Sequence, residues 1–129
     1  MTPQEKPPKN AESWGAANNP VTDVRISSDA TVVVLTGDVF LMSAEALHTT
    51  LRQIVAEGRP QKLVLDVRGV SSMDSAGIGA LMTVTRRVSS YGGKLVLFGL
   101  SRRLRDVFEA TKLDKLFTIR ETEDEARQV

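Results

Sequence analysis

The stretch of sequence that decides the fold reads Val67-Arg68-Gly69-Val70-Ser71-Ser72-Met73-Asp74-Ser75-Ala76-Gly77-Ile78-Gly79. It follows the apolar run Leu63-Val64-Leu65, and it leads into apolar residues at helical spacing that end near Val88. This pattern predicts a strand, then a short loop, then a helix. Asp74 and Ser75 stand where the helix is expected to begin. We therefore interpret the chain as a small α/β scaffold that presents Ser75.

The composition indicates one ordinary globular domain. The chain has 129 residues, enough for one hydrophobic core, and its 17 basic and 16 acidic side chains give a net charge of +1. Such a balance provides no overall charge that would attract nucleic acid or an anionic membrane. The absence of cysteine excludes disulfides and thiolate chemistry. No apolar run approaches the roughly 18 residues that a membrane span needs, and residues 1–20 lack the apolar core of a signal peptide. We expect a soluble, cytoplasmic protein.

The first twenty residues differ in composition from the rest. They contain four of the five prolines (Pro3, Pro7, Pro8 and Pro20), and Trp14 is their only strongly apolar residue. Such a segment buries too little surface to offset the entropy lost on ordering. We predict a disordered tail over residues 1–20 and one folded domain over residues 21–129. Trp14 is then either simply exposed, or a contact to a partner or to the domain surface.

The remaining pattern alternates strands and helices. Strands near residues 21–26 and 31–36 are joined by the turn Ser27-Ser28-Asp29, which predicts an antiparallel hairpin. A helix over residues 44–57 is expected to begin after Ser43 as N-cap, with Gly58 just beyond its end. The further expected elements are a strand at 63–67, a helix at 75–90, a strand at 94–98, a helix after the cap Ser101, a short edge strand within 113–119 and a short helix at 123–127. This order predicts an α/β fold with one mixed sheet of about five strands and four helices packed mainly on one face.

The expected inward faces follow from helical spacing. In the second helix they are Ile78, Leu81, Met82, Thr85 and Val88, and in the third helix Leu104, Val107 and Phe108.

The polar residues of interest are expected at one rim of the sheet, where the carboxyl ends of parallel strands meet. They are Asp38, Asp66, Asp74, Ser75 and Ser101. A helix N-terminus favours negative charge, so a phosphate on Ser75 would be well received there, although Asp74 would repel it. Gly77 and Gly79 each cost up to about 1 kcal/mol in a helix, which suggests close approach of another chain or of neighbouring backbone. Taken alone, this local pattern fits helix capping by Asp74 or Ser72 better than a regulatory phosphorylation site at Ser75.

Other candidate sites are weak. Gly92-Gly93-Lys94 lacks P-loop spacing and is interpreted as a turn. His48 is the only histidine and is expected at the surface, and nothing fixes a distance between Asp66 and Asp74. The arginines at 86, 87, 102, 103 and 105 form either a basic edge or solvated helix faces. We predict no catalytic residue, no metal site and no cofactor.

The stretch from Leu63 to Gly79 resembles the STAS domain of bacterial anti-sigma factor antagonists. That family carries a strand, an Asp-Ser-x-Gly-(apolar)-Gly turn and a helix. Further matching pieces are Gly37 after a strand, Ala44-Glu45-Ala46-Leu47 opening a helix, Gly92-Gly93-Lys94-Leu95 before a strand, and the segments from Ser101 to Phe108 and from Leu113 to Phe117. The resemblance covers about residues 21–127.

The resemblance implies a regulated ligand rather than an enzyme. Ser75 matches the family's phosphoacceptor, and Asp74 is its acidic neighbour. Unphosphorylated, such a protein binds an anti-sigma serine kinase and frees a sigma factor. Phosphorylation by that kinase breaks the complex, and a serine phosphatase resets it. The partner surface is expected to include Asp38, Phe40, Asp74, Ser75, Ala76, Gly77 and Ile78.

One position departs from the family pattern. Many phosphorylated members have an aspartate where this sequence has Phe40, at the end of Gly37-Asp38-Val39-Phe40. Phe40 and Met42 would instead offer an apolar rim suited to a protein contact. Two alternatives therefore stay open. One is a non-phosphorylated STAS adaptor subunit of a transporter or signalling scaffold, and the other is a small nucleotide- or ligand-binding domain, although the chain lacks a phosphate-binding glycine loop.

Overall fold

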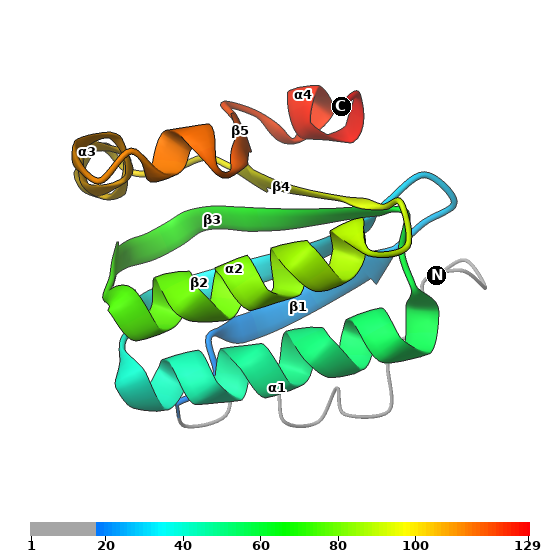
Figure 1. Ribbon diagram of the computed structural model, residues 1–129, viewed down its shortest axis with the longest axis horizontal. Coiled ribbons are helices and arrows are strands. Elements are labelled where there is room, and N and C mark those ends of the chain that lie inside the picture. The colour runs from blue at the N-terminus through cyan, green and yellow to red at the C-terminus, as the bar shows by residue number, and fades with distance from the viewer. Residues whose placement is uncertain (1–17) are drawn as a thin grey trace.

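The computed structural model describes residues 18–129 (Figure 1). The elements are β1 (Val21–Ile26), β2 (Thr31–Val39), α1 (Leu41–Gly58), β3 (Lys62–Met73), α2 (Ser75–Ser89), β4 (Lys94–Phe98), α3 (Arg102–Ala110), the 3-10 turn η3 (Leu113–Lys115), β5 (Thr118–Arg120) and α4 (Glu123–Arg127). Residues 1–17 lie outside the described residues, so the disordered tail stays a prediction there. Pro20 is buried, and its carbonyl accepts a hydrogen bond from the Thr36 amide at 3.0 Å. Asn19 and Pro20 thus already contact the domain.

The sheet is mixed, as predicted. Its five strands lie in the order β1-β2-β3-β4-β5. β1 pairs with β2 in antiparallel orientation, and the other three pairs are parallel. The parallel strands are continuous apolar runs, as strands buried on both faces usually are.

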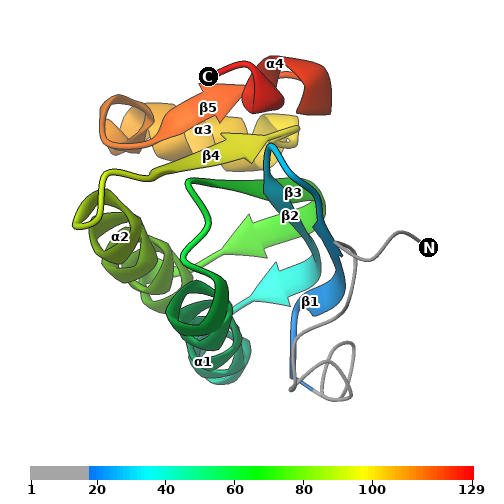
Figure 2. The ribbon, with the colours of Figure 1, turned by 90° about the vertical axis from the view of Figure 1, so that its right-hand side faces the viewer.

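Helices cover the two faces of the sheet unequally. α1, α2 and α3 share one core with the sheet, to which they contribute buried side chains such as Leu47, Leu81 and Phe108. The short α4 lies on the other face, where Ala126 packs with Val32, Val64, Val96 and Phe98. Figure 2 shows α1 and α2 side by side on one side of the sheet, with α4 away from them. The prediction of helices mainly on one face is confirmed.

α1 begins earlier than the sequence pattern indicated. It starts at Leu41, its N-cap is Phe40, and Ser43 is the third helical residue rather than the cap. Ser43 nevertheless contributes to capping from within the first turn, because its hydroxyl accepts a hydrogen bond from the amide of the N-cap residue Phe40 at 2.9 Å. At the other end Gly58 is the last helical residue, and Arg59 takes the left-handed conformation, with φ 41°. Glycine was expected there because it adopts positive φ without steric cost.

β3 is longer than predicted. It continues through Met73 instead of ending at Val67, because its second half pairs with the end of β2, where Val39 lies opposite Met73. The register shifts twice along this pair, as β-bulges allow. The expected loop is therefore strand, and only Asp74 separates β3 from α2.

The inward faces of two helices also differ from the prediction. In α2, Ala80 and Val84 are buried, whereas Ile78, Met82 and Thr85 are only partly buried. In α3, Val107 remains 38% exposed although Leu104 and Phe108 are buried. A nine-residue helix covering a sheet margin buries a narrower stripe than helical spacing alone suggests.

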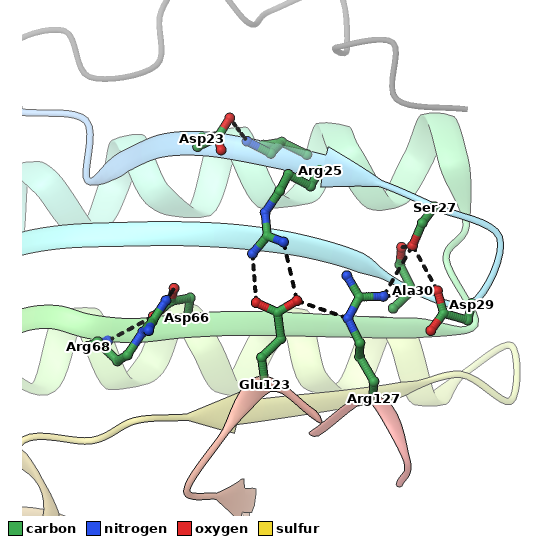
Figure 3. A network of polar contacts seen from close by, with 10 residues as sticks. Asp23, Arg25, Ser27, Asp29, Ala30, Asp66, Arg68, Glu123 and Arg127 are labelled. Atoms are coloured by element: carbon green, nitrogen blue, oxygen red, sulfur yellow. Dashed lines mark hydrogen bonds and ion pairs between the residues drawn. The ribbon is translucent and has the colours of Figure 1, made fainter. Parts of the chain in front are cut away.

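A network of charged side chains links α4 to β1 and to the turn between β1 and β2 (Figure 3). Arg25 donates to both carboxylate oxygens of Glu123, at 2.8 and 3.2 Å. Arg127 donates to Glu123 and to Asp29, each at 2.9 Å. The hydrogen bonds from Arg25 hold the pKa of the Glu123 carboxyl below its usual range. α4 thus stays on the sheet although it has only five residues.

Candidate functional site

Ser75 is the first residue of α2, and its side chain is exposed. Asp74 is the N-cap, and its carboxylate accepts a hydrogen bond from the Gly77 amide at 3.1 Å. Within residues 18–129 the Ser75 hydroxyl takes part in no hydrogen bond. The prediction of a cap is confirmed for Asp74, and the cap leaves Ser75 accessible beside it.

Gly77 lets α2 approach β2 closely. A Cβ on Gly77 would lie 2.5 Å from Met73 Cγ and 2.8 Å from the Val39 carbonyl oxygen. That carbonyl also accepts a hydrogen bond from the Asp74 amide, at 3.1 Å. The close approach expected at this glycine is thus made by neighbouring backbone. Gly79 differs, because a Cβ there would meet nothing within 4 Å.

The end of β2 forms the second wall of the site. The Asp38 carboxylate accepts a hydrogen bond from the Ser72 hydroxyl at 3.1 Å, so Ser72 is engaged with Asp38 rather than capping α2. Phe40 follows, 46% exposed, at the position where the family pattern has an acid. The pairing of Val39 with Met73 brings this wall next to Asp74 and Ser75.

Three consecutive apolar side chains stand out from this wall. Phe40, Leu41 and Met42 are 46%, 70% and 68% exposed, and we call them the apolar ridge. Beside the ridge, an open groove of about 300 Å³ runs between α1 and α2 and includes Leu41, His48, Ala76 and Gly79 in its lining. Sequence reasoning singled out Phe40 and Met42 but neither Leu41 nor the groove, although the apolar triplet is visible in the sequence.

The sequence-predicted residues do not all converge on this site. Asp38, Phe40, Asp74, Ser75 and Ala76 gather around the β2–α1 and β3–α2 junctions. Ile78 is half-buried and packs against the core, and Gly77 is buried, so Gly77 shapes the site without presenting a side chain.

Asp66 is not at the rim where it was expected. β3 continues beyond it, and its buried carboxylate accepts hydrogen bonds from Arg68 Nε at 3.0 Å and Nη2 at 2.7 Å. The Arg68 guanidinium in turn lies 5.2 Å from the centre of the Phe98 ring. Asp66 therefore serves a local ion pair and is not partnered with Asp74.

Two features are absent from residues 18–129, a cluster of metal-ligating side chains and a membrane-spanning helix. Between Asn18 and Val129 no group of three or more His, Asp or Glu side chains is arranged to hold a metal ion. In the same part of the chain, every helix is too short or too polar to cross a bilayer. The site combines the exposed Ser75, its acidic neighbour Asp74 and the apolar ridge.

The sequence and the fold match a family of known proteins. Residues 22–126 match the family model of the STAS domain. The chain is 31% identical over 97 residues to the anti-sigma-B factor antagonist of Bacillus subtilis, a match that covers 75% of this chain and 87% of the relative. The chain belongs to the anti-sigma factor antagonist family of STAS domains. Members of this family are regulators and not enzymes, in agreement with the prediction.

Further relatives support the same assignment. The anti-sigma-B factor antagonist of Listeria monocytogenes is 40% identical over 63 residues, which cover 49% of this chain and 55% of that protein. A crystal structure of an anti-sigma factor antagonist from Mycobacterium paratuberculosis superposes with a TM-score of 0.72 at 26% identity, over 81% of this chain and 88% of that one. The phosphorylated form of SpoIIAA, a Bacillus cell fate determinant, shares the fold, with a TM-score of 0.63 at 21% identity over 82% of this chain and 96% of that one.

Proposed function

We propose that this chain is a cytoplasmic antagonist that binds an anti-sigma serine kinase and so releases a sigma factor, and that phosphorylation of Ser75 ends the binding. The observation that carries the proposal is the exposed, unbonded hydroxyl of Ser75 at the start of α2. Family membership supports the kind of partner, an anti-sigma factor. A serine phosphatase would reset the switch.

The proposed switch works through charge and desolvation. Phosphate adds about −1.5 to −2 charges at pH 7. At Ser75 this charge would lie next to Asp74 and close to the apolar ridge. A partner that covers the ridge would have to strip water from the phosphate without offering it a counter-charge, which is unfavourable. The free N–H groups of α2 favour the phosphate, so the domain itself stays folded.

The proposed contact surface comprises Asp38, Phe40, Asp74, Ser75, Ala76 and Ile78, with Gly77 beneath it. The ridge would supply the apolar centre of this interface, where exposed aromatic and aliphatic residues usually contribute most of the binding energy. No nucleic acid contact is part of the proposal.

The decisive experiment combines phosphorylation and binding. The purified chain is incubated with its anti-sigma serine kinase and ATP, and phosphate is mapped by mass spectrometry. We expect it at Ser75 and not at Ser71 or Ser72. Ser75→Asp should weaken kinase binding, whereas Ser71→Asp, which adds the same charge at an exposed position in β3, should change it much less. No phosphate at Ser75, or unchanged binding by Ser75→Asp, would refute the switch.

Phe40 favours a second candidate, a non-phosphorylated STAS adaptor in a transporter or signalling scaffold. A phenyl ring offers a kinase no polar group at a position where phosphorylated relatives are expected to have an acid. Phe40→Asp separates the two candidates. If Phe40→Asp is phosphorylated at Ser75 faster than a slowly phosphorylated wild type, the switch is present and Phe40 limits its phosphorylation by the kinase. If neither protein is phosphorylated and Ser75→Asp binds its partner normally, the adaptor is the better description.

A further inference from the structure

A second hollow is lined by the apolar ridge, and it shares only Leu41 with the groove between α1 and α2. Its volume is about 500 Å³, within the roughly 300–1,000 Å³ range of protein binding pockets. Asn18, Asn19 and Pro20 form one wall, and Phe40, Leu41 and Met42 line the other. The hollow therefore opens where the described part of the chain begins.

The fold itself does not require the apolar ridge. Its three residues are 46%, 70% and 68% exposed, and three consecutive exposed apolar residues are unusual at a protein surface unless something covers them. Ser43, and not any ridge side chain, caps α1. An occupant of the hollow would explain why the residues are apolar.

The sequence supplies an occupant close by. We propose that the indole of Trp14 occupies this hollow and packs on Leu41 and Met42. Trp14 is the only tryptophan and the only large apolar side chain between Met1 and Asn18. Four residues of extended chain reach at most about 14 Å, so Trp14 is held near the wall that Asn18 begins.

The tether makes even a weak contact effective. Because only three residues separate Trp14 from Asn18, the indole is kept at an effective concentration on the order of the millimolar range. The ring buries apolar area on the ridge, and its N–H needs an acceptor, for which the Asp38 carboxylate in the lining of the hollow is available. The contact needs one anchor only, so it is compatible with a segment that has no core of its own.

The docking does not depend on the proposed function, but one consequence does. Trp14 would cover part of the surface proposed for the anti-sigma partner, so the N-terminal segment would compete with that partner. Trp14→Ser should then bind the kinase more tightly than the wild type. If Trp14→Ser binds the kinase no more tightly than the wild type, competition with the partner is refuted. The docking itself is tested separately by the fluorescence measurements below.

The test reads the fluorescence of Trp14, the single tryptophan of the full chain. We expect emission at shorter wavelength and weaker acrylamide quenching than in the urea-unfolded chain. Leu41→Ser and Met42→Ser should shift the emission to longer wavelength and raise the quenching. Leu116→Ser is the matched control, because Leu116 is 61% exposed and lies between η3 and β5. It should leave both readouts unchanged.

Several outcomes would overturn the proposal. They are wild-type emission equal to that of the unfolded chain, an equal shift in Leu116→Ser, or protection that disappears on dilution, which would assign the hollow to a second copy. Circular dichroism checks that each variant is folded. As an independent measurement, the ¹⁵N-amide spectrum of Trp14→Ser should differ from wild type at Leu41 and Met42 and not at Leu116; unchanged ridge amides would also refute the docking.

Discussion

Replacement of Gly77 by alanine tests how tightly α2 is set against β2. The new Cβ would lie 2.5 Å from Met73 Cγ, 2.8 Å from the Val39 carbonyl oxygen and 2.9 Å from Val39 Cγ1. The carbonyl cannot withdraw freely, because it accepts the hydrogen bond of the Asp74 amide. Overpacking of this kind costs about 1–3 kcal/mol, and the better helix propensity of alanine offsets up to about 1 kcal/mol. We expect a net loss of about 1–2 kcal/mol in the free energy of unfolding.

Gly79→Ala is the matched control in the same helix. Nothing lies within 4 Å of its added Cβ, so only the propensity gain of up to about 1 kcal/mol remains. The propensity gain is common to both variants, so they should differ by the overpacking cost of about 1–3 kcal/mol. This corresponds to about 4–12 °C in Tm for a domain of this size.

The assay is urea unfolding followed by far-ultraviolet circular dichroism, with the m-value as a check on two-state behaviour. A Gly77→Ala chain as stable as Gly79→Ala would show that α2 and β2 can separate without cost. The close contact between Gly77 and Val39 would then not explain why position 77 is a glycine.

Three further changes probe the caps and the α4 network. Asp74→Ala should lower the free energy of unfolding by about 1 kcal/mol, while Asp74→Ser keeps most of the stability in the same urea assay. Ser43→Ala should cost a similar amount, about 1 kcal/mol, because its hydroxyl serves the Phe40 amide; an unchanged midpoint would argue against capping from within the helix. The pKa of Glu123 is lowered in the folded state, so its contribution is present above the unfolded pKa of about 4.3 and is lost as pH falls through the lower folded value. Glu123→Gln should accordingly flatten the loss of stability below about pH 5 in acid titrations, and a curve that keeps the wild-type slope would contradict this assignment.

Elements defined by local chemistry were predictable from the sequence. Ser101 and Thr122 each cap the helix that follows, through hydrogen bonds to the amides of Leu104 and Glu125. β4 spans the residues that its apolar run indicated. Capping and strand propensity depend on a few neighbouring residues, so one sequence carries the information.

Features that depend on distant pairing were not predictable. The segment from Arg68 to Ser72 reads as a loop, yet it is strand because the end of β2 lies beside it. The register shifts in this pair leave no mark in the local pattern. Val107 illustrates the same limit, since its spacing from Leu104 indicates an inward position and yet it is 38% exposed.

The candidate site was predicted in part for the same reason. Asp74 and Ser75 belong to one local motif, so their places as cap and first helical residue follow from the sequence. The opposite wall, with Asp38 hydrogen-bonded to Ser72, exists only because β2 and β3 pair to their ends. The exposure of Leu41, unlike that of Phe40 and Met42, was not predicted, because it depends on the true start of α1.

The way α1 is capped bears on how this family can diversify. Because Ser43 reaches back to the Phe40 amide, position 40 contributes only its backbone to the helix start. Its side chain is thus not needed for the start of α1, and it lies at the edge of the surface around Ser75. Mutation can exchange an acid for a phenyl ring there at little cost to the scaffold. Paralogous antagonists in one cell could drift apart in partner choice through this single position, long before the rest of the domain changes.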